Sequence, residues 1–328
     1  MTRIVIVLLI CIAGCMLAGL AHGDVALSYA EIATVLLQPS KAAPHVQMII
    51  YDLRMPRLLL SILVGGALAV AGVVAQAIMR NPLAEPGILG INSGAALAIM
   101  IVIVGLDNVP AHLTPWAGFL GASVMAATIY GLSWRNGASS LRIILIGIGL
   151  SSMAGAMTTT LSTFGEIMDV QRALIWLAGS VYHADWASVR TLALWLVAPL
   201  ALTIVSARML DLIQLGDPVA KGLGQRVNLV RALMIVLCTL ISGAAVAAAG
   251  LIGFIGLVAP HLARRLVGPM HRRLLPVSAL IGALLVLCAD IVGRTVMVPA
   301  QLPAGLVVAL IGAPFFGFLL WRHRHVTA

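Results

Sequence analysis

Apolar segments of nearly membrane-spanning length follow one another along the whole chain. About ten of them approach the length needed to cross about 30 Å of hydrocarbon, and no connection between them is long enough for a soluble domain. Hydrophobic residues make up 61% of the 328 positions and charged residues 9%, a composition outside the soluble class. The sequence therefore predicts an all-α polytopic membrane protein, with residues 1–328 forming a single transmembrane domain. The predicted spans are residues 4–20, 57–78, 88–105, 116–133, 141–163, 186–205, 228–249, 250–267, 274–293 and 303–321.

Lysine and arginine are distributed unevenly among the connections. With the N-terminus inside the cell, most of the 20 basic residues fall in inner connections and most of the 11 acidic residues in outer ones. Because basic residues concentrate on the cytoplasmic side, both termini are predicted to be cytoplasmic. On the outer side, residues 168–185 are amphipathic and carry Trp176, Tyr182 and Trp186. This pattern is typical of a helix lying in the membrane interface.

The positive net charge does not indicate a nucleic-acid partner. The formal charge is +9, but the basic residues form short clusters between apolar runs and have no interleaved aromatic residues, so we expect no nucleic-acid binding. The cysteines lie inside apolar runs without a CxxC pair or clustered histidines, and we expect no metal site. Cys15 also follows a motif that could be a lipoprotein cleavage site, although a first membrane helix is the favoured interpretation. The cysteines are Cys11, Cys15, Cys238 and Cys288.

The region 228–267 is short for the two crossings that it must contain. Arg231 and His261 are both predicted on the inner side but lie only roughly 30 positions apart, whereas two full crossings need about 40 residues. At least one helix is therefore expected to be short. The alternative is one long tilted helix, which would reverse the sidedness of everything that follows. Four glycines are candidates for the break, because glycine weakens a helix: Gly243, Gly250, Gly253 and Gly256.

The stretch from Arg80 to Gly90, RNPLAEPGILG, joins two predicted spans through a rigid polar link. Pro82 and Pro86 remove backbone donors and fix φ, so this link cannot be continuous helix. Irregular backbone at membrane depth persists only where protein or a water-filled cavity shelters it. The link therefore predicts a transport pathway.

The chain contains no motif for covalent chemistry. Its two lysines, Lys41 and Lys221, lie outside any phosphate-binding G-x-x-x-x-G-K-[ST] pattern, and there is no HExxH or plausible catalytic triad. We therefore expect no enzymatic activity and no cofactor bound by this chain, with ATP used by a partner. A short helix begun by Asp217 and Pro218 and ended by Gly222 and Gly224, within an inner loop at about 207–227, is the predicted docking element.

Two long signatures resemble one transporter family. The link around Asn81 is similar to the NPLA-P-x-LG loop of the iron-siderophore, haem and cobalamin ABC importer permeases, and GFIGLVAPHLARRLVG, from Gly253, followed by HRRLLPVSALIGALL, is similar to their second signature. Similarity extends over most of residues 54–321. It implies the type II ABC importer permease fold in a bacterial cytoplasmic membrane. The implied partners are two ATP-binding subunits, a periplasmic or lipid-anchored binding protein, a second identical or paralogous permease subunit, and membrane lipids.

The resemblance assigns roles to individual positions. It implies an inner gate at Asn81, Leu83, Ser139 and Ser140. It implies contact with the ATPases through Asp217, Ala220 and Gly224, and through a second cytoplasmic face at about 259–274 with Pro260, His261 and Arg264. It implies docking of the binding protein at Arg54, Arg57 and Arg294.

Simpler roles for these side chains stay open. Arg54 and Arg57 could lie at the membrane surface, Arg294 could pair with Asp290 at i, i+4, and His261 could anchor a helix end.

The expected cargo is an iron(III) chelate of the siderophore or ferric-citrate type, because DVQRALIWLAGSVYHADW is most similar to ferric-citrate-type subunits. Haem and cobalamin are the alternatives within the family. A secondary transporter would need ionisable groups inside the membrane, where only Asp290 lies near a span. A channel would work without partners.

Overall fold

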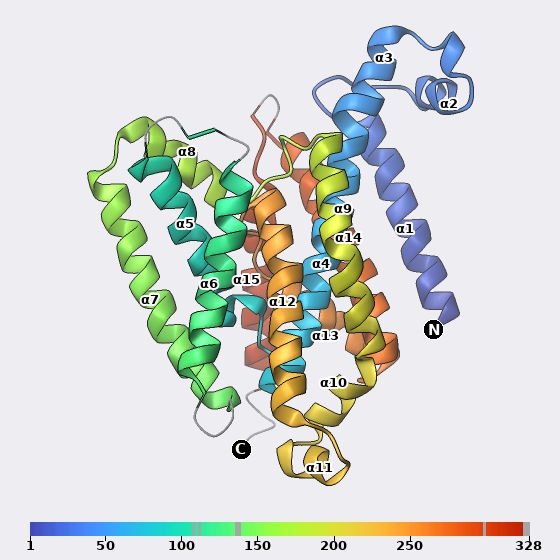
Figure 1. Cartoon of the computed structure of the whole chain (residues 1–328). Helices are drawn as coiled ribbons and strands as arrows, with labels where there is room; N and C mark the ends of the chain where they lie inside the picture. Colours follow the sequence, from blue (N-terminus) through green and yellow to red (C-terminus); the bar gives the residue numbers. More distant parts are fainter. Residues whose placement is uncertain (107–108, 111–112, 135–138, 298–299, 324–328) are drawn as a thin grey trace.

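The fold is a bundle of helices, seen in a computed structural model that describes residues 1–106, 109–110, 113–134, 139–297 and 300–323 (Figure 1). The regular elements of these residues are helices, as the sequence predicts. The long helices are α1 (Thr2–Ala21), α4 (Met55–Met79), α5 (Ile91–Gly105), α6 (Thr114–Leu132), α7 (Ser140–Phe164), α9 (Trp186–Val205), α12 (Val227–Ala249), α13 (Ile255–Val267), α14 (His271–Thr295) and α15 (Ala304–His323). The shorter ones are α2 (Tyr29–Leu37), η1 (Pro39–Lys41), α3 (Pro44–Met48), η2 (Ile49–Arg54), η3 (Pro86–Leu89), α8 (Ile167–Leu177), α10 (Ala207–Gln214) and α11 (Asp217–Gly222).

Each predicted span corresponds to one of the long helices. Within the described residues, 7 are long and apolar enough to cross a membrane by length and composition. Two are shorter than expected: α5 has 15 residues and α13 has 13. In contrast, α4 is longer than expected, because η2 and α3 continue it back to Pro44 in one helical run of 36 residues.

The break expected between residues 228 and 267 lies at Gly250. Helix α12 ends at Ala249, Gly250 has φ +72°, and α13 begins only at Ile255. A single tilted helix is therefore excluded. Gly243 and Gly256 lie inside α12 and α13 and do not break them, which corrects that part of the prediction.

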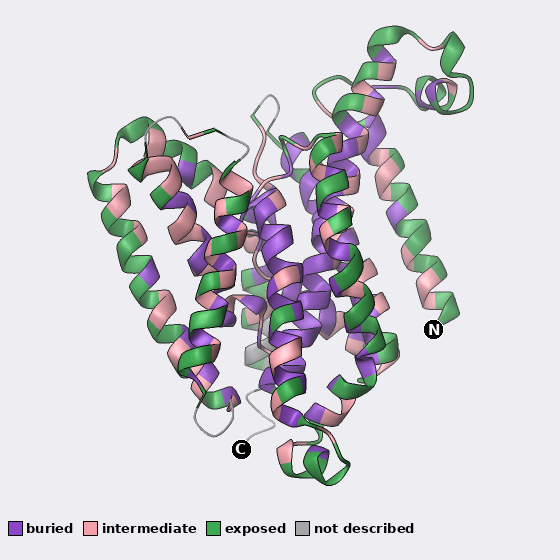
Figure 2. Cartoon of the chain, in the orientation of Figure 1, coloured by how far each residue is buried: buried purple, intermediate pink, exposed green. Residues whose placement is uncertain are grey.

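Helix α4 forms the centre of the bundle, between α12, α13 and α14, and Figure 2 shows buried residues along this group. Two glycine contacts set the packing distance. A methyl group at Gly65 would lie 2.2 Å from the Gly282 carbonyl oxygen of α14, and one at Gly72 would lie 2.0 Å from that of Gly256 in α13. Such small residues let helix backbones approach closely. No side chain larger than hydrogen fits at these positions.

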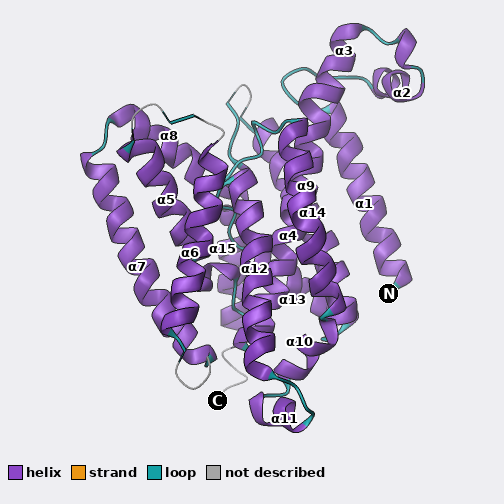
Figure 3. Cartoon of the chain, in the orientation of Figure 1, coloured by secondary structure: helices purple, strands orange, loops and turns teal. Residues whose placement is uncertain are grey.

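The two ends of the bundle differ in structure. Helix α1 begins at the same end as α10 and α11, while α2, α3 and α8 lie at the opposite end (Figure 1). Figure 3 shows loops at both ends and also between helices inside the bundle. Exposed basic residues mark the end that carries α11: Arg208, Lys221, Arg226, Arg265, Arg272 and Arg273. Two further basic residues that the charge distribution assigns to the inner side, Arg135 and Arg324, fall outside the described residues.

Candidate functional site

The stretch from Arg80 to Gly90, which we call the gate loop, folds into a tight turn between α4 and α5. Arg80 ends α4 in the left-handed conformation, with φ +50°. The Asn81 side-chain oxygen then accepts a hydrogen bond from the Leu83 backbone N–H at 2.9 Å, and the Asn81 N–H donates to the Gln76 carbonyl at 3.1 Å. Asparagine stabilises such turns through its own side chain. Asn81 therefore shapes the loop that carries Leu83.

The second predicted gate stretch lies against the end of α4. The Ser140 hydroxyl donates to the Ile78 carbonyl at 2.9 Å and is buried, while Ser139 precedes α7 without a side-chain cap bond. Further along α7, a methyl group at Gly147 would lie 2.3 Å from the Ile88 carbonyl oxygen. The structure thus brings α7 and the gate loop into direct contact. Their role as a gate stays a prediction.

Glu85 is a functional candidate that the sequence analysis did not single out. Its side chain is half-buried in the gate loop and lies beside the Phe254 backbone N–H. Phe254 precedes α13 and has φ +64°, a left-handed conformation that is costly for a residue with a side chain. A carboxylate at a helix N-terminus satisfies a free N–H group and complements the helix dipole. Glu85 therefore ties the gate loop to the start of α13.

A second connection joins α13 to α4 beside the gate loop. The Arg264 guanidinium donates to the Gln76 side-chain oxygen at 2.9 Å, and the Gln76 amide donates to the Gly256 carbonyl at 3.3 Å. Pro260 is buried in the same helix and His261 is half-buried. Arg264 was predicted to contact a partner, but in this chain its guanidinium is directed to α4. Helix α13 is thus linked to α4 through Arg264 and Gln76, and its start lies beside Glu85 of the gate loop.

Replacing Glu85 with alanine is expected to increase amide hydrogen exchange across residues 253–257 and to lower the free energy of unfolding by about 1–3 kcal/mol, the cost of an unsatisfied buried donor. Glu85→Gln keeps an acceptor oxygen and should retain most of the protection. Hydrogen exchange read by mass spectrometry measures both, with Glu166→Ala, an exposed carboxylate before α8, as the control. Equal exchange in Glu85→Ala and Glu166→Ala would contradict the Phe254 contact.

The predicted coupling helix is present as α11. Asp217 accepts a hydrogen bond from buried Arg231 at 2.8 Å, with Arg80 at 3.9 Å. Ala220 is fully buried against this chain, so it is not the outward face of the helix. Three exposed apolar residues lie along this segment, and we call them the apolar stripe: Leu215 before the helix, Val219 within it and Leu223 at its C-cap, which are 58%, 50% and 61% exposed. Gly224, also exposed, has φ +82° and ends the turn.

The two predicted cytoplasmic stretches are joined to each other. The His271 ring Nδ1 lies 2.6 Å from the Asp211 carboxylate, and the His271 backbone N–H donates to the same oxygen at 3.0 Å. Asp211 thereby caps the start of α14 from α10. Exposed Arg265, Arg272 and Arg273 flank this contact. The stretches at 207–227 and 259–274 therefore form one continuous surface.

The three outer arginines are buried in this chain. Arg54, Arg57 and Arg294 are only 5%, 7% and 3% exposed. Arg54 donates to the backbone carbonyls of Leu20 and Val25, and Arg294 donates to that of Gly19 at 2.8 Å. The guanidinium groups thus hold the C-terminal end of α1, where carbonyls lack helical partners.

Asp290 is the buried counter-charge of this cluster. Its carboxylate lies 2.8 Å from Arg57 Nη2 and also accepts from Arg57 Nε, at 2.9 and 3.1 Å. The i, i+4 pair with Arg294 is present but longer, at 4.0 Å. Arg57 reaches further to Gln301 at 2.7 Å, and Gln301 to Asp24 at 2.9 Å. Asp290, the acid considered for a secondary transporter, is therefore held in a buried ion pair.

One side of α7 carries exposed hydroxyl residues, which we call its polar face, beside exposed Leu145 and Ile148. Ser152, Thr159, Thr160 and Thr163 are exposed, and each hydroxyl donates to the carbonyl four residues earlier. Methyl groups added at Gly149 or Gly155 would meet nothing within 4 Å. Polar residues within a span normally face protein or a water-filled cavity rather than lipid. This face is therefore a candidate surface for contact with a second chain or with a water-filled path.

The chain is similar to known transport proteins. A sequence profile of the FecCD transport family matches residues 7–322. The chain is 42% identical over 313 residues to the achromobactin transport system permease protein CbrC of Dickeya dadantii (strain 3937), covering 94% of this chain and 88% of CbrC. It is 39% identical over 321 residues to the Fe(3+) dicitrate transport system permease protein FecD of Escherichia coli (strain K12), covering 98% and 99%.

A solved structure shares the fold. It is described as an inward-facing conformation of a metal-chelate type ABC transporter, with a TM-score of 0.89, 30% identity, and coverage of 98% of this chain and 100% of that one. The profile match, these relatives and the shared fold together show that this chain belongs to the FecCD transport family, as a multi-pass membrane permease of an ABC transporter.

Proposed function

We propose that the chain is the permease subunit of an ATP-driven importer for an iron(III) chelate of the siderophore or citrate type, in a bacterial cytoplasmic membrane with both termini inside. The observation that carries this proposal is the polar face of α7, which lies on a membrane-crossing helix and adjoins the gate loop through Gly147 and Ile88. Its hydroxyls suit a hydrophilic chelate rich in oxygen atoms. The relative FecD, named for Fe(3+) dicitrate, supports iron as the metal.

The α7 face also supports a second permease subunit. The small residues and hydroxyls of this face suit close packing against helices of another chain. A second copy or a paralogous chain placed against it would enclose a central path. The gate at Asn81, Leu83, Ser139 and Ser140 would then close the inner end of that path.

Two cytoplasmic ATPase subunits would supply the energy. The exposed apolar stripe of α11 is the kind of anchor that inserts into a cleft of a partner, and the surrounding arginines favour an acidic surface. Force on this surface would reach the gate loop through α13, by way of Arg264, Gln76 and Glu85.

A binding protein would deliver the chelate at the outer end. Docking at Arg54, Arg57 and Arg294 requires carboxylates of that protein to compete with the Leu20 and Val25 carbonyls and with Asp290 for the guanidinium groups. In the free chain these side chains hold α1. Docking would therefore replace the contacts that these arginines make inside the chain with ion pairs to the binding protein.

Uptake in a permease-deletion strain tests the function. We expect the chain, with its ATPase and binding protein, to restore uptake of radiolabelled iron(III) citrate or an iron(III) siderophore at least about tenfold above the empty strain, while haem and cobalamin stay at background. Replacement of the phosphate-binding lysine of the ATPase should abolish uptake. Uptake that persists without ATP hydrolysis would indicate a secondary transporter or channel, and uptake of haem or cobalamin alone would assign the other cargo.

A further inference from the structure

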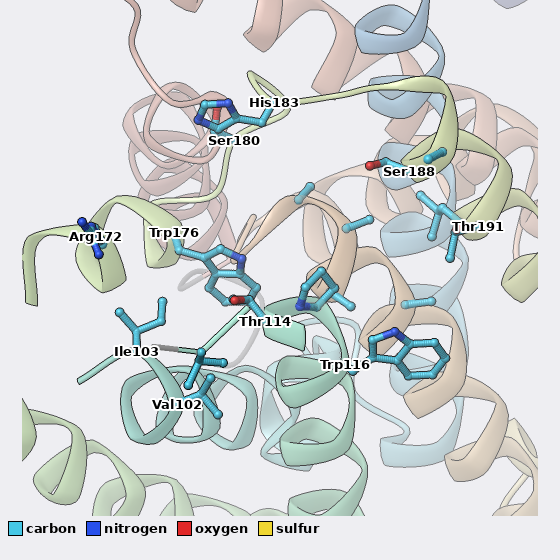
Figure 4. A pocket seen from close by; sticks show the side chains of 18 of the residues that line it. Val102, Ile103, Thr114, Trp116, Arg172, Trp176, Ser180, His183, Ser188 and Thr191 are labelled. Atoms are coloured by element: carbon cyan, nitrogen blue, oxygen red, sulfur yellow. The ribbon is translucent and has the colours of Figure 1, made fainter. Parts of the chain in front are cut away.

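A large cavity opens at the outer end of the bundle, away from the proposed path. Its volume is about 1480 Å³, and it lies between α5 and α8 on one side and α9 and α12 on the other (Figure 4). No residue of the gate loop or of α7 lines it. The proposed transport function leaves this space unassigned.

One end of the cavity is polar and carries both signs of charge. On α8, Arg172 and Asp169 form an exposed pair at 3.2 Å. Opposite them, Asp185 accepts hydrogen bonds from the Ser188 backbone N–H and hydroxyl at 2.7 and 2.6 Å, which cap α9 and lower the pKa of Asp185 below its ordinary value. His183 lies at this end of the cavity, as Figure 4 shows. The rim is therefore zwitterionic, with ionised groups of both signs.

The rest of the lining is apolar. Val102 and Ile103 of α5 face it at the end away from His183 (Figure 4). Leu192 of α9 and the alanines of α12, among them Ala244 and Ala248, also line the cavity. Because α12 contributes only methyl groups here, the helices leave a gap that larger side chains would fill. The cavity thus changes from polar to apolar along its length.

Tryptophans and lipid-facing residues border the cavity. Trp116 and Trp195 stack edge to face with their ring centroids 4.6 Å apart, and Trp176 lines the α8 side. Tryptophan is typical of the interface between water and hydrocarbon. Trp116 is 49% exposed and Leu106 is 54% exposed at the mouth, so the cavity is continuous with the apolar outer surface of the bundle. Its volume also exceeds the usual range for drug-sized ligands, about 300–1,000 Å³.

We infer that this cavity binds one phospholipid of the outer leaflet with a zwitterionic headgroup. The phosphate lies at Arg172 and His183, the ammonium group at Asp169, and an acyl chain runs along Ala244 and Ala248. Opposite charges placed side by side complement a headgroup that carries both signs, whereas a purely anionic headgroup would meet Asp169 and Asp185. Lipid tails are as apolar as this wall, so selectivity comes from the headgroup and from the shape of the gap.

Native mass spectrometry of the purified full chain in detergent with phosphatidylethanolamine tests the site. The wild-type chain is expected to retain one lipid. Ala248→Phe, which narrows the cavity, and Arg172→Glu, at a side chain that is 70% exposed, should each reduce retention by about tenfold. Ala201→Phe, at an exposed alanine of α9 that does not line the cavity, is the matched control and should retain lipid normally.

A second measurement uses the cavity tryptophans. Brominated phosphatidylethanolamine should quench their fluorescence in the wild-type chain and in Ala201→Phe, and less in Ala248→Phe. Equal retention and quenching in all variants would overturn the site, and equal retention of phosphatidylglycerol would overturn the zwitterionic assignment. Displacement of the lipid by iron(III) citrate would place the cavity on a chelate path and overturn the lipid assignment. None of these measurements requires the ATPase or transport activity.

Discussion

Replacing Asp290 with alanine is expected to lower the free energy of unfolding by about 3–5 kcal/mol, the usual cost of removing one partner from a buried ion pair. Asp290 is 1% exposed and is the carboxylate that faces both Arg57 and Arg294. Without it, two guanidinium groups stay buried beside each other without their counter-charge. Unfolding of the purified protein in mixed detergent and sodium dodecyl sulfate, followed by circular dichroism, measures the change.

The exposed pair on α8 is the matched control for this prediction. Asp169→Ala also removes a carboxylate from an arginine, at 3.2 Å, but Arg172 is 70% exposed. Water solvates the remaining charge, so the expected loss is at most about 1 kcal/mol. A triple variant with leucine at Arg57, Asp290 and Arg294 should recover part of the loss, since apolar residues of similar volume can replace buried ion pairs. Losses of equal size for Asp290→Ala and Asp169→Ala would contradict the buried network.

Replacing Val219 with aspartate is expected to abolish assembly with the ATPase subunits. Val219 is at the middle of the exposed stripe formed with Leu215 and Leu223. If this stripe inserts into an apolar cleft, the new carboxylate must be buried without a partner, and an anchor residue of this kind contributes at least about 2 kcal/mol to binding. The affinity should therefore fall by roughly 30-fold or more. Co-purification of the ATPase with a tagged permease, and ATP hydrolysis by the complex, measure it.

Lys221→Ala provides the control on the same helix. Lys221 is exposed but lies off the apolar stripe, and rim charges change affinity little. The Val219→Asp chain should stay monodisperse alone, because the side chain at this position is 50% exposed and the new carboxylate can be solvated by water. If Val219→Asp assembles normally, the cytoplasmic contact lies elsewhere, and the surface around Arg265, Arg272 and Arg273 becomes the first candidate.

Local features of the fold were predictable because they depend on nearby residues. Proline and glycine set the link after Arg80, the break at Gly250, and the limits of α11. Composition and apolar length predicted the spans. The sequence could also show that α7 carries hydroxyl groups within a span, but not that Ser152 and Thr160 would be exposed on the outside of a single chain.

Contacts between distant segments were not predictable from local patterns. The sequence predicts a pair between Asp290 and Arg294, its neighbour on the same helix. The closer partner of Asp290 in the structure is Arg57, 233 positions earlier. The sequence analysis placed Arg54 at an accessible surface, while the structure uses it to hold the end of α1. In the same way, Glu85 drew no attention because its partner is the backbone of Phe254, and a backbone N–H has no sequence signature.

The long separation of Arg57 and Asp290 also affects how the protein is made. At about 5–20 residues per second, the ribosome needs roughly 10–50 s to synthesise the 233 positions between them. Early in that time α4, the most buried helix of the bundle, has been made, whereas its neighbours α12 to α14 have not. Until Asp290 is made, the Arg57 guanidinium lacks this counter-charge and stays in water or among lipid headgroups. Newly made chains are therefore most vulnerable to proteases before the ninth long helix arrives, and stopping synthesis upstream of Asp290 should yield products that are rapidly degraded.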